Sequence, residues 1–160
     1  MLELILGNEA DAEIASQIYD SVRGRGLTVW SESYPHLSDA IRDARAGCLY
    51  ILRDNGANVG CCSVEPGAED DDLPFWKICD GSHREISRIA VSFSCQGRGY
   101  AKTMVQMLIE RLMAGGVRSI HLLCAKKNLP AVKTYRALGF EFIGECYRYG
   151  ADYYVCEKLL

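Results

Sequence analysis

The chain has 160 residues, of which 49% are apolar and 24% are charged, as expected for one soluble domain with an ordinary core. The net charge is -3 and Lys and Arg form no continuous stripe, which argues against a protein that binds nucleic acid. No apolar run reaches the roughly 18 residues of a membrane span, and the start of the chain does not resemble a signal peptide, so we expect a cytoplasmic protein with no membrane partner.

The first half of the chain predicts a strand, two helices and a β-hairpin. Asn8 is a suitable cap for the first helix, and the hairpin is indicated by Asn55-Gly56, two residue types that tolerate a positive φ. In order, the expected elements are a strand over 2–6, a helix ending near Val22, a helix over 37–46, and strands over 48–52 and 58–64.

The second half continues with alternating strands and helices and then two final strands. Gly144 is a residue that favours a β-bulge in the first of these two strands. The expected elements are a strand over 84–92, a helix over 99–114, a strand over 119–124, a helix over 129–138, and strands over 140–144 and 153–159. The whole chain, residues 1–160, therefore predicts a single mixed α/β domain without a repeat or a linker.

Eight cysteines raise the question of a metal or disulfide framework. The chain contains no C-x-x-C pair, and most of its cysteines stand in apolar runs. Free cysteine behaves as a small buried hydrophobe, so we expect reduced cysteines and no metal site. Cys95 has no histidine next to it in the sequence, and we expect it to be inert rather than a nucleophile.

A glycine-rich turn carries the first functional signal. It reads Gln96-Gly97-Arg98-Gly99-Tyr100-Ala101 and lies between a predicted strand and a predicted helix. Glycines let a ligand approach the main chain closely, and the N–H groups and dipole at a helix start favour an anion such as a pyrophosphate. The sequence therefore predicts an anion-binding turn.

The sequence of this turn does not match two other nucleotide-binding motifs. A dinucleotide-binding fingerprint requires Gly or Ala where Lys102 stands, and a Walker loop requires Gly where Ala101 precedes Lys102-Thr103. A nucleotide-binding protein remains an alternative only because pyrophosphate recognition is chemically generic.

A second motif follows about thirty residues later, where residues 128–140 spell N-x-x-A-x-x-x-Y-x-x-x-G-F. Together with the Q-x-x-G-x-A turn, this pattern resembles the GCN5-related N-acetyltransferase (GNAT) superfamily, and specifically its bacterial single-domain members. The strong resemblance covers residues 85 to 144. It implies the GNAT fold, a mixed sheet of about six to seven strands flanked by about four helices, and acetyl-CoA as the cofactor.

The resemblance also assigns roles to the residues that match the motifs. The turn and the adjoining residues would hold the pyrophosphate of coenzyme A, the preceding strand would pair with the pantetheine arm, and Asn128 would face that arm. The cofactor-binding residues implied in this way are Ile89, Ala90, Val91, Gln96, Gly97, Arg98, Gly99, Tyr100, Ala101, Lys102, Asn128, Ala131 and Tyr135. Asn128 is equally suited to cap the helix that follows it.

Catalysis of acyl transfer to an amine calls for an acid and a base. Tyr135 is the expected general acid for the leaving sulfur, although its helical spacing with Ala131 also fits plain packing. Glu85 is the first candidate for the base, because the superfamily often places a carboxylate there, and His83 is the second. Strand alternation puts four residues on one face of the strand, Glu85, Ser87, Ile89 and Val91. A main-chain N–H near Ala90 or Val91 would stabilise the oxyanion.

The sequence gives weaker evidence about the residues that bind the acceptor amine than about those that bind the cofactor. Trp30 and Tyr34-Pro35 match a W-x-x-x-Y-P stretch found in a bacterial subgroup of the superfamily, and with Trp76 they are candidates for an acceptor pocket or for core packing. That subgroup tends to have His where Ser87 stands. The acidic segment Glu69 to Asp72 is either a solvated loop or a feature that attracts a cationic amine.

Two functions of different class follow from these patterns. The first is an N-acetyltransferase that moves the acetyl group of acetyl-CoA to the amine of a small molecule or a peptide by direct attack. The second is an inactive module that binds acyl-CoA and serves as a sensor or partner-binding domain. A homodimer through the final strands is compatible with both functions.

Overall fold

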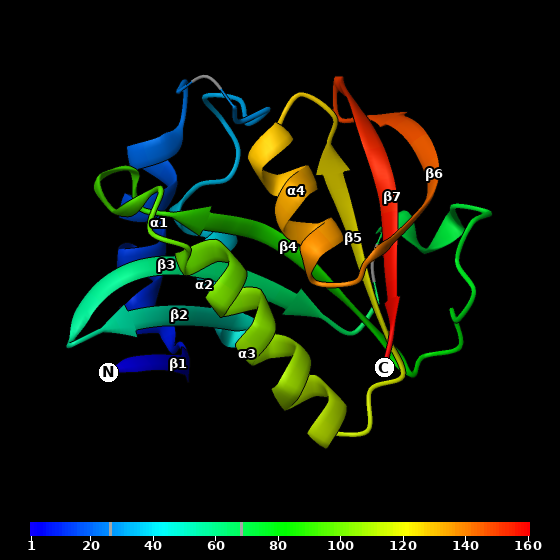
Figure 1. The fold of residues 1–160 in the computed structure, drawn as a ribbon. Helices are drawn as coiled ribbons and strands as arrows, with labels where there is room; N and C mark the ends of the chain where they lie inside the picture. Colours follow the sequence, from blue (N-terminus) through cyan, green and yellow to red (C-terminus); the bar gives the residue numbers. More distant parts are fainter. Residues whose placement is uncertain (26, 68) are drawn as a thin grey trace. The chain divides into compact units, whose positions relative to one another are not determined.

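A seven-stranded sheet, with the strand order β1-β2-β3-β4-β5-β7-β6, organises this computed structural model (Figure 1). The structure describes residues 1–25, 27–67 and 69–160. The described residues form two compact units, one from Met1–Val64 and Arg88–Met104 and the other from Glu65–Ser87 and Val105–Leu160. The order of helices and strands is the predicted β-α-α-β-β-β-α-β-α-β-β order, which confirms the expected fold class.

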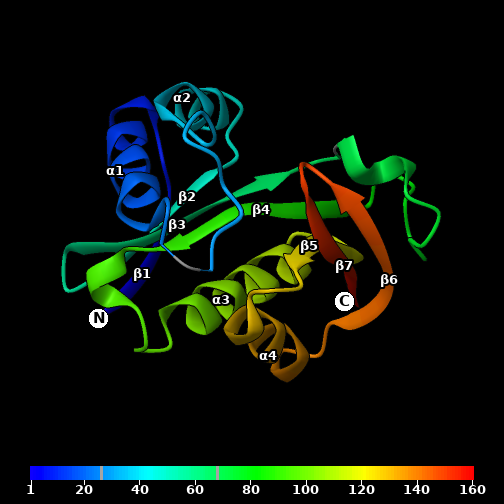
Figure 2. The same ribbon diagram turned by 90° about the horizontal axis from the view of Figure 1, so that it is seen from above.

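The first unit begins with an antiparallel meander that is covered by two helices. Figure 2 shows α1 and α2 side by side along these strands. The elements are β1 (Leu2–Leu6), η1 (Glu9–Asp11), α1 (Ala12–Val22), α2 (Leu37–Arg45), β2 (Leu49–Asp54) and β3 (Ala57–Glu65). Asn8 caps the first turn as predicted, because its Oδ1 accepts a hydrogen bond of 2.8 Å from the N–H of Ala10.

The core of the first unit lies between α1 and the meander. Small residues of α1, Ala12 and Ala15, are fully buried and let the helix approach the sheet, where Leu49 and Ile51 are fully buried too. The hairpin between β2 and β3 turns at Asn55 (φ 49°) and Gly56 (φ 83°). Two successive positive φ values are typical of a type I′ turn, and this predicted turn is confirmed.

The second unit contains the parallel pair of the sheet and its final hairpin. β4 and α3 contribute residues to both units, and α4 packs on β5. The elements are η2 (Glu69–Asp72), β4 (His83–Val91), η3 (Phe93–Cys95), α3 (Tyr100–Ala114), β5 (Ser119–Ala125), α4 (Leu129–Ala137), β6 (Glu141–Arg148) and β7 (Ala151–Leu159). β4 pairs in parallel with β5 from His83 to Glu85.

The final hairpin differs from its prediction in length. β6 extends to Arg148 and joins β7 through Tyr149 (φ 53°) and Gly150 (φ 76°), another turn with two positive φ values. The prediction ended β6 at Gly144, because Tyr rarely adopts a left-handed conformation and gave no turn signal. The register does shift between Phe142 and Gly144, so the predicted bulge is confirmed.

All eight cysteines are free, and five of them are buried. Burial raises the pKa of the Cys62 thiol to about 12, with a further contribution from the charge of Asp43, so this thiol stays protonated and unreactive. The expectation of reduced core cysteines holds for these five positions, whereas Cys79 is exposed. Among the helices of the described residues, none is long and apolar enough to cross a membrane.

Candidate active site

The glycine-rich turn lies in the first unit and presents a row of main-chain donors. Gly97 and Gly99 have φ values of 77° and 80°, a conformation that glycine adopts without strain. The first main-chain hydrogen bond of α3 runs from the N–H of Thr103 to the carbonyl of Gly99 (3.0 Å). Within the described residues, the N–H groups of residues 97–102 donate no hydrogen bond. Several adjacent unpaired donors at a helix start form an anion-binding concavity.

Two side chains of the turn fix its position within the first unit. Gln96 donates through Nε2 to the carbonyl of Val91 at 3.4 Å, which ties the turn to the end of β4. The hydroxyl of Tyr100 donates to Oδ2 of Asp54 at 2.6 Å, which ties the start of α3 to the β2–β3 hairpin. The N–H groups between these anchors are therefore preorganised rather than free to move with the turn.

The strand before the turn carries a local irregularity at Arg88, whose φ is 48°. A left-handed residue inside a strand interrupts the regular alternation of side chains, so the predicted parity of Glu85 and Ser87 with the later residues fails at this point. Ala90 and Val91 are buried and Ile89 is partly exposed. A Cβ on Gly60 would lie 3.0 Å from the carbonyl oxygen of Ala90, so this glycine permits the close approach of β3.

A buried ion pair holds this irregular residue in place. The guanidinium of Arg88 donates from Nε and a terminal nitrogen to the two carboxylate oxygens of Asp43, at 2.7 and 3.0 Å. A third nitrogen donates to the hydroxyl of Tyr34 at 2.8 Å. The side chains of Arg88 and Asp43 are only 6% and 3% exposed, so this bidentate pair is shielded from water. It links α2, the segment containing Tyr34, and β4.

Glu85 lies in the second unit on the N-terminal part of β4. Its side chain is buried, and Oε2 has no hydrogen-bond partner among the described residues. Burial raises the pKa of Glu85 to about 9, and the charge of Asp70 and a hydrogen bond with it add to the effect. Asp70 is itself buried and accepts hydrogen bonds from Arg148 (2.8 Å) and Tyr149 (3.0 Å).

The second predicted base, His83, is engaged elsewhere. Its ring is buried and its Nε2 lies 3.0 Å from Oδ1 of Asp71, so it is hydrogen-bonded within the second unit. Glu85 is therefore the better candidate of the two for proton transfer, because one of its oxygens has no partner in the described part of the chain.

The second motif forms the start and the centre of α4. Asn128 caps the helix, accepting a hydrogen bond of 3.2 Å from the N–H of Ala131 through Oδ1. Tyr135 is buried and packs edge-on against Phe140, with ring centroids 5.6 Å apart. Asn128 therefore caps α4 and Tyr135 packs against Phe140, as one of the two interpretations of each residue predicted. Neither interpretation conflicts with a catalytic phenol, because packing of the ring leaves the hydroxyl to a separate interaction.

The aromatic candidates for an acceptor pocket are divided between the units. In the first unit, Trp30 packs edge-on against Tyr19 and joins the core, whereas Tyr34 is 40% exposed. In the second unit, the indole of Trp76 stacks on His121 at 3.8 Å and donates to the carbonyl of Asp70.

The acidic segment is an ordered turn of helix. Glu69–Asp72 forms η2, and Arg148 of β6 donates to the carboxylates of Asp70 and Asp72, at 2.8 Å in each case. Packing against the final hairpin orders this segment, which by composition alone looked like a solvated loop. Arg148 neutralises part of the negative charge that, in the alternative interpretation, would attract a cationic amine.

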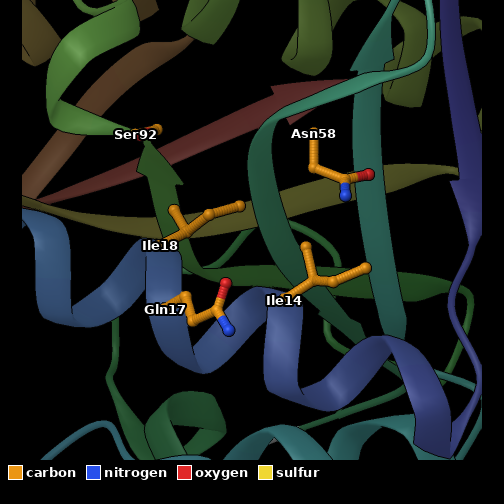
Figure 3. A pocket seen from close by; sticks show the side chains of 5 residues that line it. All are labelled: Ile14, Gln17, Ile18, Asn58 and Ser92. Carbon is orange, nitrogen blue, oxygen red and sulfur yellow. The ribbon is translucent and has the colours of Figure 1, made fainter.

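A separate pocket lies in the first unit and contains none of the predicted site residues. Figure 3 shows its lining by Ile14, Gln17 and Ile18 of α1, Asn58 of β3, and Ser92. Sequence reasoning missed Asp43 of the first unit, and it named Asp70 of the second unit only as part of the acidic segment, without its effect on Glu85. The available signal was an Arg within an apolar strand at position 88, because a buried cation requires a buried anion.

Comparison with known proteins identifies the family. A family model described as the acetyltransferase (GNAT) family matches residues 15–140, more than half of the chain. No curated protein sequence matches significantly. Many solved structures match this chain. The three described next are 16% to 22% identical in sequence, and their likeness supports a shared fold.

Three of the solved structures illustrate the likeness. A GNAT family acetyltransferase from Streptococcus agalactiae 2603 is 21% identical with a TM-score of 0.83, covering 99% of this chain and 95% of that one. The protein yncA from Salmonella typhimurium, solved with its cofactor acetyl-CoA, is 16% identical with a TM-score of 0.77, covering 100% and 94%. A ribosomal-protein-alanine N-acetyltransferase from Brucella melitensis is 22% identical with a TM-score of 0.75, covering 99% of each chain. The chain belongs to the GNAT family of acetyltransferases and has its fold.

Proposed function

We propose that this protein is an N-acetyltransferase that moves the acetyl group of acetyl-CoA to a primary amine of a small molecule or a peptide by direct attack. The proposal rests on the family and above all on one observation: the N–H groups over residues 97–102 donate no hydrogen bond within the part of the chain that the structure describes. A pyrophosphate carries the charge that these donors and the dipole of the 15-residue helix α3 favour.

The turn has the space that such a ligand needs. A Cβ built on Gly97 or on Gly99 would meet no atom within 4 Å, so the main chain of both residues is open to a ligand. Following the family pattern, residues 96–102 hold the pyrophosphate, Ile89–Val91 pair with the pantetheine arm, and Asn128, Ala131 and Tyr135 contact the rest of the arm. When bound, acetyl-CoA supplies an activated acyl group.

Glu85 is the proposed base. An amine must lose a proton to become a nucleophile or to complete its attack, and a base with a pKa of about 9 is well matched to an amine of similar basicity. At neutral pH most of the Glu85 carboxyl is protonated, so the fraction able to accept a proton rises about tenfold per pH unit. The proposed enzyme thus becomes faster with increasing pH until Glu85 is ionised.

The remaining roles belong to Tyr135 and the main chain of β4. The phenol of Tyr135 donates its proton to the sulfur that leaves, and the N–H of Ala90 or Val91 stabilises the oxyanion. For the acceptor, we propose contacts with Tyr34 and Trp76. Trp30 is partly buried and packs against the core of the first unit, so its packing role is sufficient to explain it.

Binding of the acyl donor is the first test, because it requires no knowledge of the acceptor. Calorimetry and thermal unfolding with acetyl-CoA, coenzyme A, ATP and NAD should show binding of the first two alone, since a ligand of the native state raises its stability. Gly99→Glu should abolish this binding by placing bulk and negative charge in the row of donors.

Gly116→Glu is the matched control for this variant. Gly116 has a φ of 81° and open space around its Cβ position, and it follows the other end of the same helix. Both variants therefore carry the same backbone strain and the same added charge. Equal loss of acetyl-CoA binding in the two variants, or no binding to the unaltered protein, would refute the assignment of residues 97–102.

An inactive acyl-CoA sensor is the second candidate, and the protonated state of Glu85 at neutral pH is the observation that favours it. A measurement of turnover distinguishes the enzyme from the sensor. Coenzyme A release with any amine of a broad panel, measured between pH 7 and 9.5, establishes the enzyme, whereas tight binding without release at any of these pH values establishes the sensor.

A homodimer through the edge strand β6 is a further proposal, to be tested by light scattering.

A further inference from the structure

Three side chains with metal-binding donor atoms meet in the second unit, where β4 begins. Asp71 comes from η2, Cys79 from the segment that follows it, and His83 is the first residue of β4. Nε2 of His83 lies 3.0 and 3.1 Å from the two carboxylate oxygens of Asp71, and Sγ of Cys79 lies 4.0 Å from the same nitrogen. All three donor atoms lie within 4.8 Å of one another.

This set of donors matches the coordination chemistry of zinc. Zinc binds thiolate sulfur at about 2.3 Å, imidazole nitrogen at about 2.0 Å and carboxylate oxygen at about 2.0 Å in tetrahedral geometry. These bond lengths place the sulfur and nitrogen about 3.5 Å apart and the nitrogen and oxygen about 3.3 Å apart. The observed separations of 4.0 and 3.0 Å differ from these values by half an ångström or less, and the sulfur lies within 4.8 Å of a carboxylate oxygen, so rotation of the Cys79 and Asp71 side chains would complete the geometry.

The histidine is held rigidly with one nitrogen directed at this cluster. His83 is only 2% exposed, and its ring stacks on that of His121, which stacks in turn on Trp76. Its Nδ1 has no hydrogen-bond partner among the described residues, so Nε2 is the ring nitrogen that interacts, and it faces Asp71 and Cys79. A ligand whose orientation is fixed by packing loses little entropy when it binds an ion.

The opposite side of the cluster is accessible. Cys79 is exposed and the side chain of Asp71 is 33% exposed. A Cβ at Gly67 would lie 3.2 Å from Oδ2 of Asp71 and 4.0 Å from Nε2 of His83, so the glycine leaves space beside the donor atoms. An ion at this position can therefore enter from solvent and retain room for a fourth ligand.

We propose that Asp71, Cys79 and His83 form a binding site for one zinc-type divalent cation, with a water molecule in the fourth coordination position. The ion would connect η2, the segment before β4, and β4 itself. Because η2 also carries Asp70, occupancy of this site would also fix the position of Asp70. The site itself does not depend on the proposed acetyl transfer.

Cobalt substitution tests the proposal directly, because cobalt(II) reports both its geometry and a thiolate ligand by absorption. Untagged, fully reduced protein should bind one Co²⁺ per chain, with a thiolate charge-transfer band in the near ultraviolet and the intense visible bands of a tetrahedral site. Zn²⁺ should displace the Co²⁺ and raise the temperature of unfolding. Cys79→Ser should remove the charge-transfer band, and Asp71→Asn should weaken binding by more than about tenfold.

Cys146→Ser is the control, because Cys146 is a free and partly exposed thiol in the same unit that lies outside the cluster. It should bind Co²⁺ as the unaltered protein does. A second measurement covers the case in which Cys79→Ser fails to fold: in the unaltered protein, bound Zn²⁺ should slow alkylation of Cys79 at least about tenfold, as mapped by mass spectrometry. Absence of the thiolate band in folded protein, a band that survives Cys79→Ser, or alkylation of Cys79 unaffected by Zn²⁺ would overturn the proposal.

Discussion

Replacement of Glu85 by Gln makes the clearest prediction about stability. Gln has nearly the same shape as the protonated carboxyl but does not titrate, so the variant keeps the packing of Glu85 and removes its proton equilibrium. Burial and the charge of Asp70 raise the pKa of Glu85 in the native state to about 9, whereas an unfolded chain has the ordinary value of 4.5. Between these two pH values the native protein holds a proton that the unfolded chain releases.

The sign and size of the effect follow from proton linkage. Unfolding releases this proton, so the free energy of unfolding of the unaltered protein falls as the pH rises, by at most about 1.4 kcal/mol per pH unit. From pH 5.5 to pH 8.5 the protein should therefore lose up to about 4 kcal/mol relative to Glu85→Gln, over three pH units. Below pH 4.5 both states are protonated and the difference should be constant.

Urea unfolding of both proteins at half-unit steps of pH measures this difference, because the contributions of titrating groups that do not interact with Glu85 cancel between the two proteins. Glu141→Gln serves as the control, since Glu141 is an exposed residue of β6 and its pH dependence should follow that of the unaltered protein. Stability curves for the unaltered protein and Glu85→Gln that stay parallel from pH 5.5 to pH 8.5 would refute the reasoning from burial and from Asp70.

Three further predictions concern the ion pair, the acid and the unused thiol. Asp43→Ala should lower the free energy of unfolding by about 3–5 kcal/mol, because the buried guanidinium of Arg88 loses the carboxylate that balances its charge. Asp43→Leu combined with Arg88→Met should recover most of this loss, and equal losses in the single and double variants would contradict this. Tyr135→Phe should keep the packing on Phe140 and lower kcat about 100-fold or more, because the general acid is lost. An amine-acetylation assay measures this rate, and an unchanged kcat would mean that Tyr135 only packs. Cys95→Ala should change the same rate by less than about twofold, and a large loss would show that the thiol takes part in the reaction.

Local sequence patterns predicted the order of the elements and the two motifs of the family. The turn at Asn55-Gly56, the cap at Asn128 and the bulge near Gly144 were all readable, because each depends on conformational preferences of the residues at that point. The turn at Tyr149-Gly150 was missed for the same reason, since its tyrosine adopts a conformation that its own preferences disfavour.

The contacts that tune the candidate site were decided by tertiary structure alone. Asp70 interacts with Glu85, and Arg148 and Tyr149 of the final hairpin bind Asp70, although no local pattern connects these segments. Asp71 and Cys79 stand eight positions apart and His83 four positions further, which matches no familiar metal motif, and the fold gathers their donor atoms within 4.8 Å. The physical reason is that a motif depends on neighbours along the chain, whereas burial, pKa and coordination depend on neighbours in space.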